Sequence, residues 1–446
     1  MKETKKLHSG YNLMTAITMI VGICIGSGIF FKADDILAYT GGNVGLGVLL
    51  LSIGAFSIIF GSMTLTELSV RTSSLGGLVG FYEVFISKAF ANGFGWFQTF
   101  VYYPTINVVV AWAAGIYTVM LLGLEMTLEY QILIGTGYLL LMYAMNYGFK
   151  QIGGWFQVLT TYVKLLPLLS IAIIGMFQLA PVTTVATSET SVLQSVGFSF
   201  LAGLAPVAFS FDGWPIATSI SNEVKNPKRN MPIALTIGPL IVLIVYVTYF
   251  LGLTKLLGIE HILAVGDQAI YDVGNIIFGA YGGKLILVFV IISVLGVVNG
   301  VTLGHIRMPY ALATKKMLPN SEAVKIMNDR RQLSPRSFKI SLYTSLIWMT
   351  IHYLTQKLGL LATGDVSEIA IIFAYLCYPI LYVYVMKLYM KKEIKSHFKG
   401  IIAPMLACIG SGIIILGGIM SNPVYMPVFI VLCGIVFYQG YRFKRE

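Results

Sequence analysis

The chain has 446 residues, of which 57% are hydrophobic and 11% charged, and its formal net charge is +11. Charged residues make up about a quarter of an ordinary soluble domain, so this composition excludes a soluble globular protein and indicates an integral membrane protein. Apolar runs of about 20 residues recur along the chain and short alternating strands do not. The predicted fold class is therefore an all-α polytopic membrane protein.

Twelve transmembrane helices are expected in a single transmembrane domain, 1–446. Their predicted ranges are 13–38, 45–67, 94–122, 131–147, 153–179, 195–220, 231–254, 284–313, 338–354, 367–390, 403–420 and 425–441. With this count, nearly all of the 30 Lys and Arg residues fall in the termini and loops of one side. The positive-inside rule then predicts that both termini are cytoplasmic, so the basic charge reflects topology and not a nucleic-acid partner.

The first predicted helix, 13–38, is interrupted near its centre by Gly26, Ser27 and Gly28. Each glycine inside a helix costs about 1 kcal/mol relative to alanine, so such a cluster needs a reason. Either neighbouring helices pack closely here or the interruption exposes backbone groups for use.

The fifth predicted helix, 153–179, contains Lys164 well inside its apolar run. A lysine at the centre of a membrane helix costs about 2.5–3.5 kcal/mol on insertion scales, so it is expected to face the protein interior and find a partner. Two interpretations stay open. The side chain either extends toward the cytoplasmic end of the helix, or it supplies a fixed cation where a coupling ion could otherwise sit.

The sixth predicted helix, 195–220, carries a second interruption. Pro206 and Pro215 flank the stretch 210–213, which includes Asp212, so several backbone carbonyls lose their helical donors. In a bilayer this is tolerated only where the carbonyls line a cavity. Two interrupted helices in corresponding positions of two halves are typical of a transporter with a binding site near the membrane midplane.

The second interruption divides the chain into two sets of five helices. We expect a first inverted repeat over 13–179 (helices 1–5), a second over 195–390 (helices 6–10), and helices 11–12 within 403–441. Because each set holds an odd number of spans, the two repeats are inverted with respect to the membrane.

No enzyme activity, metal or cofactor is predicted. His, Asp, Glu and Cys do not cluster at ligand spacing within the predicted helices, and no nucleophile accompanies a base. His305 and His352 are isolated and are expected to be structural or interfacial. A receptor or channel would need a signalling domain or a repeated filter sequence, and neither is present.

The stretch 22–30, Gly-Ile-Cys-Ile-Gly-Ser-Gly-Ile-Phe, resembles the first-helix motif of the amino acid–polyamine–organocation superfamily. Together with Lys164, 211–214 and 223–232, it is similar to the L-type amino acid transporter family, particularly bacterial serine/threonine or alanine/serine/cysteine exchangers. The resemblance implies a LeuT-type fold of 5+5 inverted repeats with helices 1 and 6 broken at the midplane. It also implies sodium-independent antiport of amino acids across the plasma membrane by alternating access.

The resemblance also implies roles for individual residues. The backbone N–H groups of Ser27 and Gly28 would bind the substrate carboxylate, as a half-helix N-terminus can. Carbonyls near both breaks would bind the ammonium, and Phe209 would cover the substrate. The substrate-binding residues implied are Cys24, Ile25, Gly26, Ser27, Gly28, Phe209, Ser210 and Asp212.

A second group of residues would replace the ion of sodium-coupled relatives. Lys164 is expected to bridge the Gly26 region and the small polar patch 293–299, and Tyr246 is expected to couple the site to cytoplasmic closure. The ion-surrogate and coupling residues implied are Lys164, Tyr246, Ser293 and Asn299.

Two departures from the family pattern affect the expected partners and substrate. Animal members bind a heavy subunit through a cysteine after the third helix, but 123–129 contains none, so no disulfide-linked heavy subunit is expected. Partners are then an L-amino acid substrate and membrane lipid. Small neutral L-amino acids are the expected substrates, and a proton-coupled or cationic amino acid carrier that uses Asp212 is the alternative.

Overall fold

The computed structural model of the chain describes residues 12–26, 28–72, 77–148, 159–160, 162–177, 196–214, 224–328, 333–361 and 364–445. These residues are predominantly helical, and the one β-type pairing among them is an isolated bridge between Asn328 and Leu333. The predicted all-α class is confirmed.

The described helices follow one another along the chain. They are α1 (Leu13–Cys24), α2 (Gly28–Tyr39), α3 (Val44–Ser69), α4 (Gly77–Phe85), α5 (Lys88–Phe97), α6 (Tyr103–Leu122), α7 (Leu128–Gly148), α9 (Leu165–Phe177), α10 (Leu204–Ser210), α11 (Pro227–Leu257), α12 (Ile259–Val265), α13 (Ala269–Phe278), α14 (Gly282–Thr314), α15 (Ser321–Val324), α16 (Pro335–Lys357), α17 (Val366–Met390), α18 (Ala403–Ser421) and α19 (Tyr425–Arg445). Short 3-10 helices are η2 (Gly197–Gly203) and η4 (Gly266–Gln268), and π-helices are η1 (Gln98–Tyr102) and η5 (Phe398–Ile402).

Seven helical stretches of the described chain are long and apolar enough to cross a membrane. They are α3, the continuous stretch from α5 to α6, α11, α14, α17, α18 and α19. Each coincides with a predicted range. Helices α7 and α16 occupy two further ranges, and shorter apolar helices lie in the remaining three. The chain is therefore a multi-pass membrane protein.

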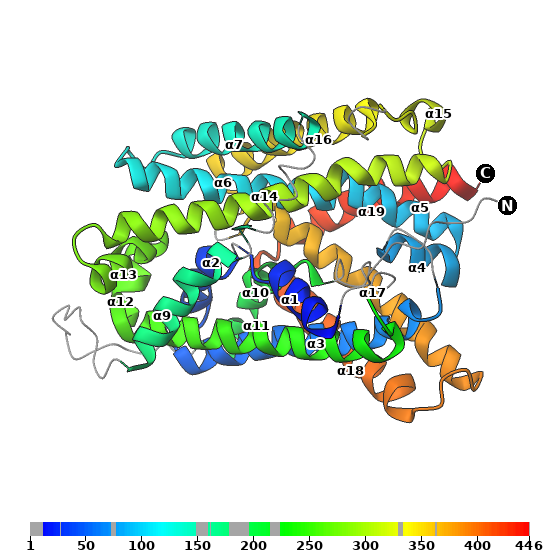
Figure 1. Cartoon of the computed structure of the whole chain (residues 1–446), viewed down its shortest axis with the longest axis horizontal. Coiled ribbons are helices and arrows are strands. Elements are labelled where there is room, and N and C mark those ends of the chain that lie inside the picture. Colours follow the sequence, from blue (N-terminus) through cyan, green and yellow to red (C-terminus); the bar gives the residue numbers. More distant parts are fainter. Residues whose placement is uncertain are drawn as a thin grey trace.

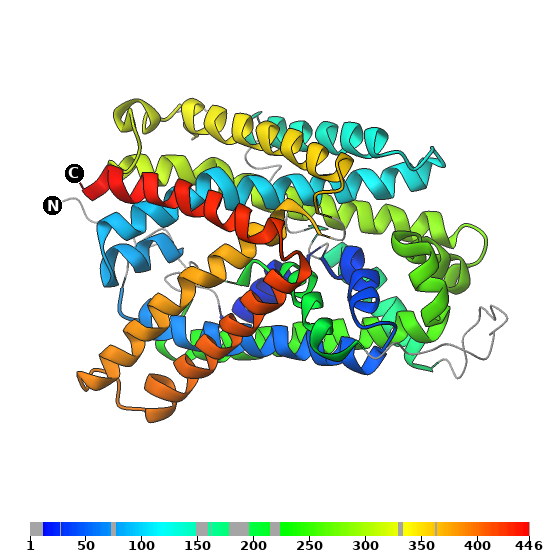
Figure 2. The same cartoon turned by 180° about the vertical axis from the view of Figure 1, so that it is seen from behind.

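The long helices form two groups with short helices between them (Figures 1 and 2). In one group α6 packs against α7 and α14, and α14 packs against α16. In the other group α3 packs against α11 and α18. The short helices α1, α2 and α10 lie between the groups, where α1 contacts α11 and α2 contacts α10. The interrupted helices therefore lie at the centre of the molecule.

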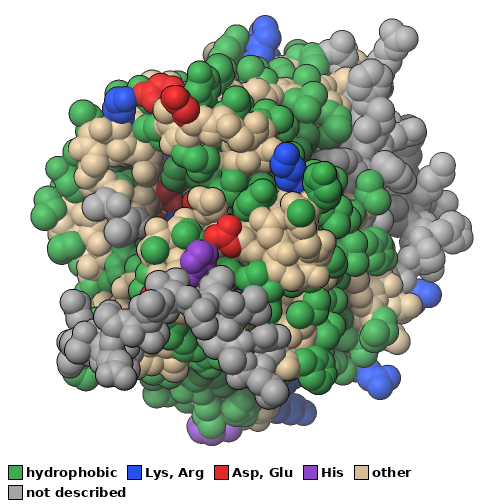
Figure 3. Space-filling view, turned by 90° about the vertical axis from the view of Figure 1, so that its left-hand side faces the viewer, with side chains coloured by type: hydrophobic (Ala, Val, Ile, Leu, Met, Phe, Trp, Pro, Cys, Tyr) green, Lys and Arg blue, Asp and Glu red, His purple; other side chains and the backbone are tan. Residues whose placement is uncertain are grey.

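The two ends of the long axis carry different elements. Helices α4 and α15 and the C-terminus lie at one end, whereas α12 and α13 lie at the other (Figure 1). Two of the loops predicted for one side of the membrane, those that contain α4 and α15, thus lie at the same end as the C-terminus. Figure 3 views the end with α12 and α13, where few charged side chains interrupt the hydrophobic and uncharged surface of the residues described.

Candidate functional site

The first predicted interruption is present in the structure. Helix α1 ends at Cys24 because Ile25 adopts an extended backbone, with φ −71° and ψ 99°. Helix α2 begins at Gly28. Ser27, a predicted substrate contact, lies outside the described residues. The break leaves the C-terminal carbonyls of α1 and the first N–H groups of α2 without partners in their own helix, as at any pair of helix ends.

The second interruption lies after Ser210, where α10 ends. A turn follows over 211–213, and Gly213 has φ 97°, a backbone conformation that glycine adopts without steric cost. Pro215, which was expected to bound this break, lies outside the described residues.

The two interruptions contact each other directly. A Cβ atom added to Gly28 would lie 2.5 Å from the Ser210 Cα atom, so only glycine fits at this crossing. The Tyr246 hydroxyl of α11 lies 3.0 Å from the Cys24 carbonyl oxygen and 2.8 Å from the Ser210 carbonyl oxygen. Tyr246 therefore joins the ends of α1 and α10. Each carbonyl oxygen keeps a second lone pair for another donor.

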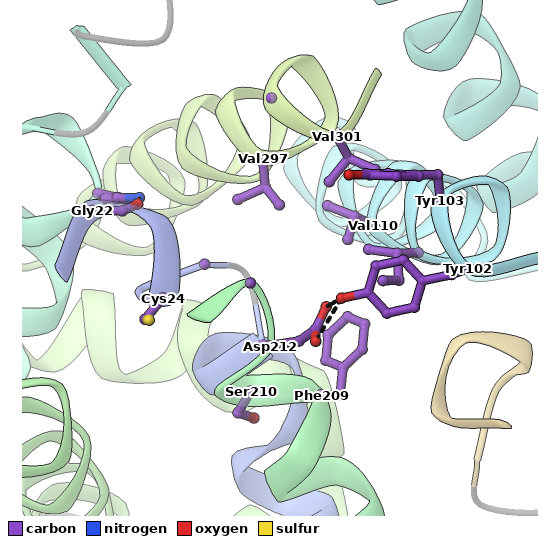
Figure 4. Close-up of a pocket in the computed structure, with 16 residues that line it drawn as sticks. Gly22, Cys24, Tyr102, Tyr103, Val110, Phe209, Ser210, Asp212, Val297 and Val301 are labelled. Carbon is purple, nitrogen blue, oxygen red and sulfur yellow. Dashed lines mark hydrogen bonds between the residues drawn. The ribbon is translucent and has the colours of Figure 1, made fainter. Parts of the chain in front are cut away.

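A cavity of about 160 Å³ lies beside this crossing (Figure 4). Its walls come from both interruptions, from α6 with the residue before it, from the chain before α9, and from α14. The lining residues are Gly22, Cys24, Gly26, Gly28, Tyr102, Tyr103, Ile106, Val110, Lys164, Phe209, Ser210, Asp212, Gly213, Val297, Gly300 and Val301. The cavity is therefore lined both by exposed backbone groups of the two helix breaks and by aliphatic side chains.

Lys164 supplies a cation to this cavity. Its side chain is buried and its Nζ atom donates a hydrogen bond to the Gly22 carbonyl oxygen of α1. The side chain thus points to the first interruption and not to the end of its helix. Asn299, its other expected neighbour, accepts a hydrogen bond of 2.7 Å from the Asn146 side-chain amide of α7.

Asp212 supplies a carboxylate to the cavity. The Tyr102 hydroxyl lies 2.8 Å and 2.7 Å from its two oxygens (Figure 4). A partly buried carboxylate is stabilised by such a donor, because an unpaired charge in a low-dielectric surrounding is costly. The cavity therefore holds one fixed cation and one fixed carboxylate.

Phe209 contacts both the cavity and a buried ion cluster. It lines the cavity, and the Lys32 ammonium of α2 lies 5.7 Å from its ring centroid. Lys32 Nζ lies 2.8 Å from Glu368, 3.0 Å from Asp365 and 3.3 Å from Asp35. The cluster ties α2 to the start of α17 behind Phe209.

The structure brings most of the predicted site residues together. Seven line the cavity: Cys24, Gly26, Gly28, Lys164, Phe209, Ser210 and Asp212. Ile25 is buried within the first break. Tyr246 contacts this break through the hydrogen bond from its hydroxyl to the Cys24 carbonyl oxygen. Ser293 and Asn299 are buried in α14 but are not among the lining residues, and the Ser293 hydroxyl has no hydrogen-bond partner among the residues described.

Sequence reasoning missed the wall that faces the two breaks. Tyr102, Ile106 and Val110 recur every four residues, the spacing of one helix face, and Val297 and Val301 do the same in α14. That spacing is a usable signal for a shared face. It does not tell a cavity wall from ordinary packing, so it could not have identified these residues alone.

A multi-pass helical protein that encloses a cavity between two interrupted helices has the architecture of a membrane transporter. The profile described as "Amino acid permease" matches residues 11–438. The chain belongs to the amino acid permease family, whose members are membrane transporters.

Individual relatives extend this comparison over the whole chain. The serine/threonine exchanger SteT of Bacillus subtilis (strain 168) is 28% identical over 452 residues, covering 100% of this chain and 99% of its own length. The b(0,+)-type amino acid transporter 1 of Rattus norvegicus is 24% identical over 470 residues, covering 99% and 90%. The Asc-type amino acid transporter 1 of Mus musculus is 25% identical over 336 residues, covering 71% and 61%.

Proposed function

We propose that the chain is a sodium-independent antiporter that exchanges small neutral L-amino acids across the plasma membrane by alternating access. The observation that carries this proposal is Lys164, whose buried ammonium contacts the Gly22 carbonyl oxygen beside the first helix break. A fixed cation at this place supplies the charge that a bound sodium ion would otherwise bring. The names of the relatives, which include a serine/threonine exchanger, support the same class of substrate.

The cavity offers partners for each part of a small amino acid. The N-terminus of α2 at Gly28 presents N–H groups and a favourable dipole to a carboxylate. Carbonyl oxygens at Cys24 and Ser210 present lone pairs to an ammonium. The aliphatic wall and a volume of about 160 Å³ favour a short side chain.

A LeuT-type arrangement of 5+5 inverted repeats fits the packing of the helices. Helices in corresponding positions of the two expected repeats contact each other: α3 contacts α11, α6 contacts α14, and α7 contacts α16. The interrupted segments α1–α2 and α10 also meet at the centre. In this proposal both termini are cytoplasmic, and no heavy subunit is attached through the loop 123–129, which lacks cysteine.

Exchange in proteoliposomes tests the proposed function. Vesicles that contain the purified chain are loaded with unlabelled serine or alanine and given labelled serine outside. We expect uptake without sodium in loaded vesicles and little uptake in empty ones. Uptake that needs a sodium gradient, or equal uptake by empty vesicles, would contradict the proposal.

Asp212 favours one alternative function, a cationic or proton-coupled amino acid carrier. Its carboxylate lines the cavity and accepts hydrogen bonds from the neutral Tyr102 hydroxyl, so it can also meet a cationic side chain or a proton. Competition by arginine, or uptake driven by a pH gradient in empty vesicles, would favour this alternative over exchange of neutral amino acids.

A further inference from the structure

We propose that His305 and Trp348 are positioning residues that hold a π-helical turn in the cavity wall and thereby aim Tyr102 and Tyr103 into the cavity. The turn is η1, which joins α5 to α6. The effect that we expect on exchange kinetics rests on the proposed function, whereas the effect that we expect on the structure of the turn does not.

The backbone of η1 leaves two carbonyl oxygens without their regular helical donors. The Tyr103 N–H donates to the Gln98 carbonyl five positions earlier, so it does not serve Thr99 as it would in an α-helix. Pro104 has no N–H and cannot serve the Phe100 carbonyl. Buried carbonyls are costly when unpaired, so both must find partners elsewhere for the turn to persist.

Two side chains from other helices supply the missing donors. His305 of α14 places its Nε2 atom 2.8 Å from the Thr99 carbonyl oxygen. Trp348 of α16 places its indole Nε1 atom 2.6 Å from the Phe100 carbonyl oxygen. The two consecutive carbonyls are thus satisfied from two different helices. The His305 contact stabilises the π-helical turn relative to a regular α-helix, in which the Tyr103 N–H would serve the Thr99 carbonyl. The Trp348 contact anchors the turn at the Phe100 carbonyl, which Pro104 leaves without a donor in either form.

His305 is itself held in the orientation that this contact needs. A carbonyl oxygen can only accept, so the proton of the imidazole is on Nε2. Its Nδ1 atom lies 2.9 Å from the Tyr143 hydroxyl of α7. The imidazole is fully buried, and it stacks on the Tyr103 ring at 5.9 Å between centroids and 12° between planes. His305 therefore contacts the turn and one of the cavity side chains at once.

The turn determines which side chains reach the cavity. Adjacent residues of a helix point about 100° apart, yet Tyr102 and Tyr103 both line the cavity. Figure 4 shows Tyr102 reaching Asp212 and the Tyr103 ring beside Val301. If the π-turn became an α-helical turn, the helix before it would move by one residue position relative to the helix after it. One position corresponds to a rotation of about 100°. The two tyrosines would then lose their present contacts.

Variants that keep the rings and remove the donors test this proposal. Trp348→Phe removes the indole N–H, and His305→Phe removes the Nε2–H while keeping an aromatic face for Tyr103. His305→Gln restores an N–H donor near the position of Nε2. Trp112→Phe is the matched control, because Trp112 in α6 donates through Nε1 to the Gln131 side chain, 3.0 Å away, and not to a carbonyl of η1.

In the exchange assay we expect Trp348→Phe and His305→Phe to raise KM about ten-fold with a smaller change in maximal rate, the effect of one lost buried hydrogen bond. His305→Gln should recover part of this loss, and Trp112→Phe should leave KM unchanged. Equal KM values for Trp348→Phe and Trp112→Phe, or loss of maximal rate alone in both donor variants, would overturn the proposal.

A structure of the His305→Phe and Trp348→Phe double variant separates this inference from the proposed function. We expect the turn over 98–102 to become α-helical and the Tyr102–Asp212 hydrogen bonds to be lost. A retained π-turn with both bonds intact would overturn the positioning role, whether or not the unaltered chain exchanges any amino acid. Absence of exchange by the unaltered chain would overturn only the proposed function.

Discussion

Gly28 and Ser210 meet where the two interrupted helices cross, and a Cβ atom on Gly28 would stand 2.5 Å from the Ser210 Cα atom. This contact is backbone against backbone, so a rotamer change cannot relieve it. The crossing fixes the first N–H groups of α2 against the carbonyl end of α10. A glycine is therefore required at position 28 by the tertiary structure as well as favoured by the break itself.

Gly28→Ala is expected to abolish most exchange. The added methyl group must push α2 and α10 apart, and overpacking of this kind costs about 1–3 kcal/mol. Initial rates in proteoliposomes at equal protein amount measure the effect. Gly412→Ala in α18 is the control, since a Cβ atom there meets no other group within 4 Å. Equal rates for the two variants would contradict the role of this crossing.

Lys164→Ala is expected to lower exchange at least ten-fold while the protein still inserts into the membrane. The variant removes the ammonium that donates to the Gly22 carbonyl oxygen, and hydrogen bonds to charged groups contribute about 1.5–3 kcal/mol. Lys284→Ala, at an exposed position of α14, controls for the loss of a positive charge. Unchanged exchange in Lys164→Ala would count against its role as an ion surrogate.

Tyr102→Phe is expected to reduce the apparent affinity for substrate about ten-fold. The variant keeps the ring but removes the hydroxyl that donates to Asp212, and this leaves a partly buried carboxylate without that donor. Competition of unlabelled against labelled serine measures the affinity. Tyr438→Phe on the exposed surface of α19 is the control. If both variants bind serine equally well, the Tyr102–Asp212 hydrogen bonds do not contribute to substrate affinity.

Lys32→Met is expected to destabilise the protein by about 3–5 kcal/mol, because removing one partner of a buried ion pair leaves uncompensated charge. Lys32 and Glu368 side chains are only 3% and 2% exposed. Thermal unfolding of the purified protein in detergent measures the change as a lower midpoint.

Lys357→Met is the matched control for this prediction. Lys357 pairs with Glu129 at 2.6 Å and, through that hydrogen bond, holds the pKa of the Glu129 carboxyl below its ordinary value. Both side chains are more than half exposed, so water replaces the lost partner and the midpoint should hardly move. Similar shifts for the two variants would show that burial of the Lys32 cluster contributes little.

Local composition was sufficient to place the two helix breaks and the intramembrane cation. Glycines at 26 and 28 and the polar stretch 210–213 oppose helix formation through their own backbone preferences, wherever the rest of the chain lies. Lys164 stands out for a similar reason, since a lysine deep in a membrane helix is costly enough to be recognised from its position in the apolar run. The all-α class followed from the composition together with the recurring apolar runs of about 20 residues.

The partners of those groups depended on tertiary structure. Lys164 contacts the Gly22 carbonyl oxygen, and Asn299 pairs with Asn146, because the rotation of each packed helix decides which side chains face each other. No local pattern encodes that rotation.

The π-turn beside the cavity likewise depends partly on local sequence and partly on tertiary structure. Pro104 lacks the N–H of a regular helix, a property that is local to the sequence, but His305 and Trp348 lie 206 and 248 residues away from the carbonyls that they satisfy. The sequence by itself therefore determined where the backbone departs from a regular helix, because that depends on neighbouring residues. Only the tertiary structure decided what those departures hold in place, because hydrogen-bond partners from distant helices are brought together by packing.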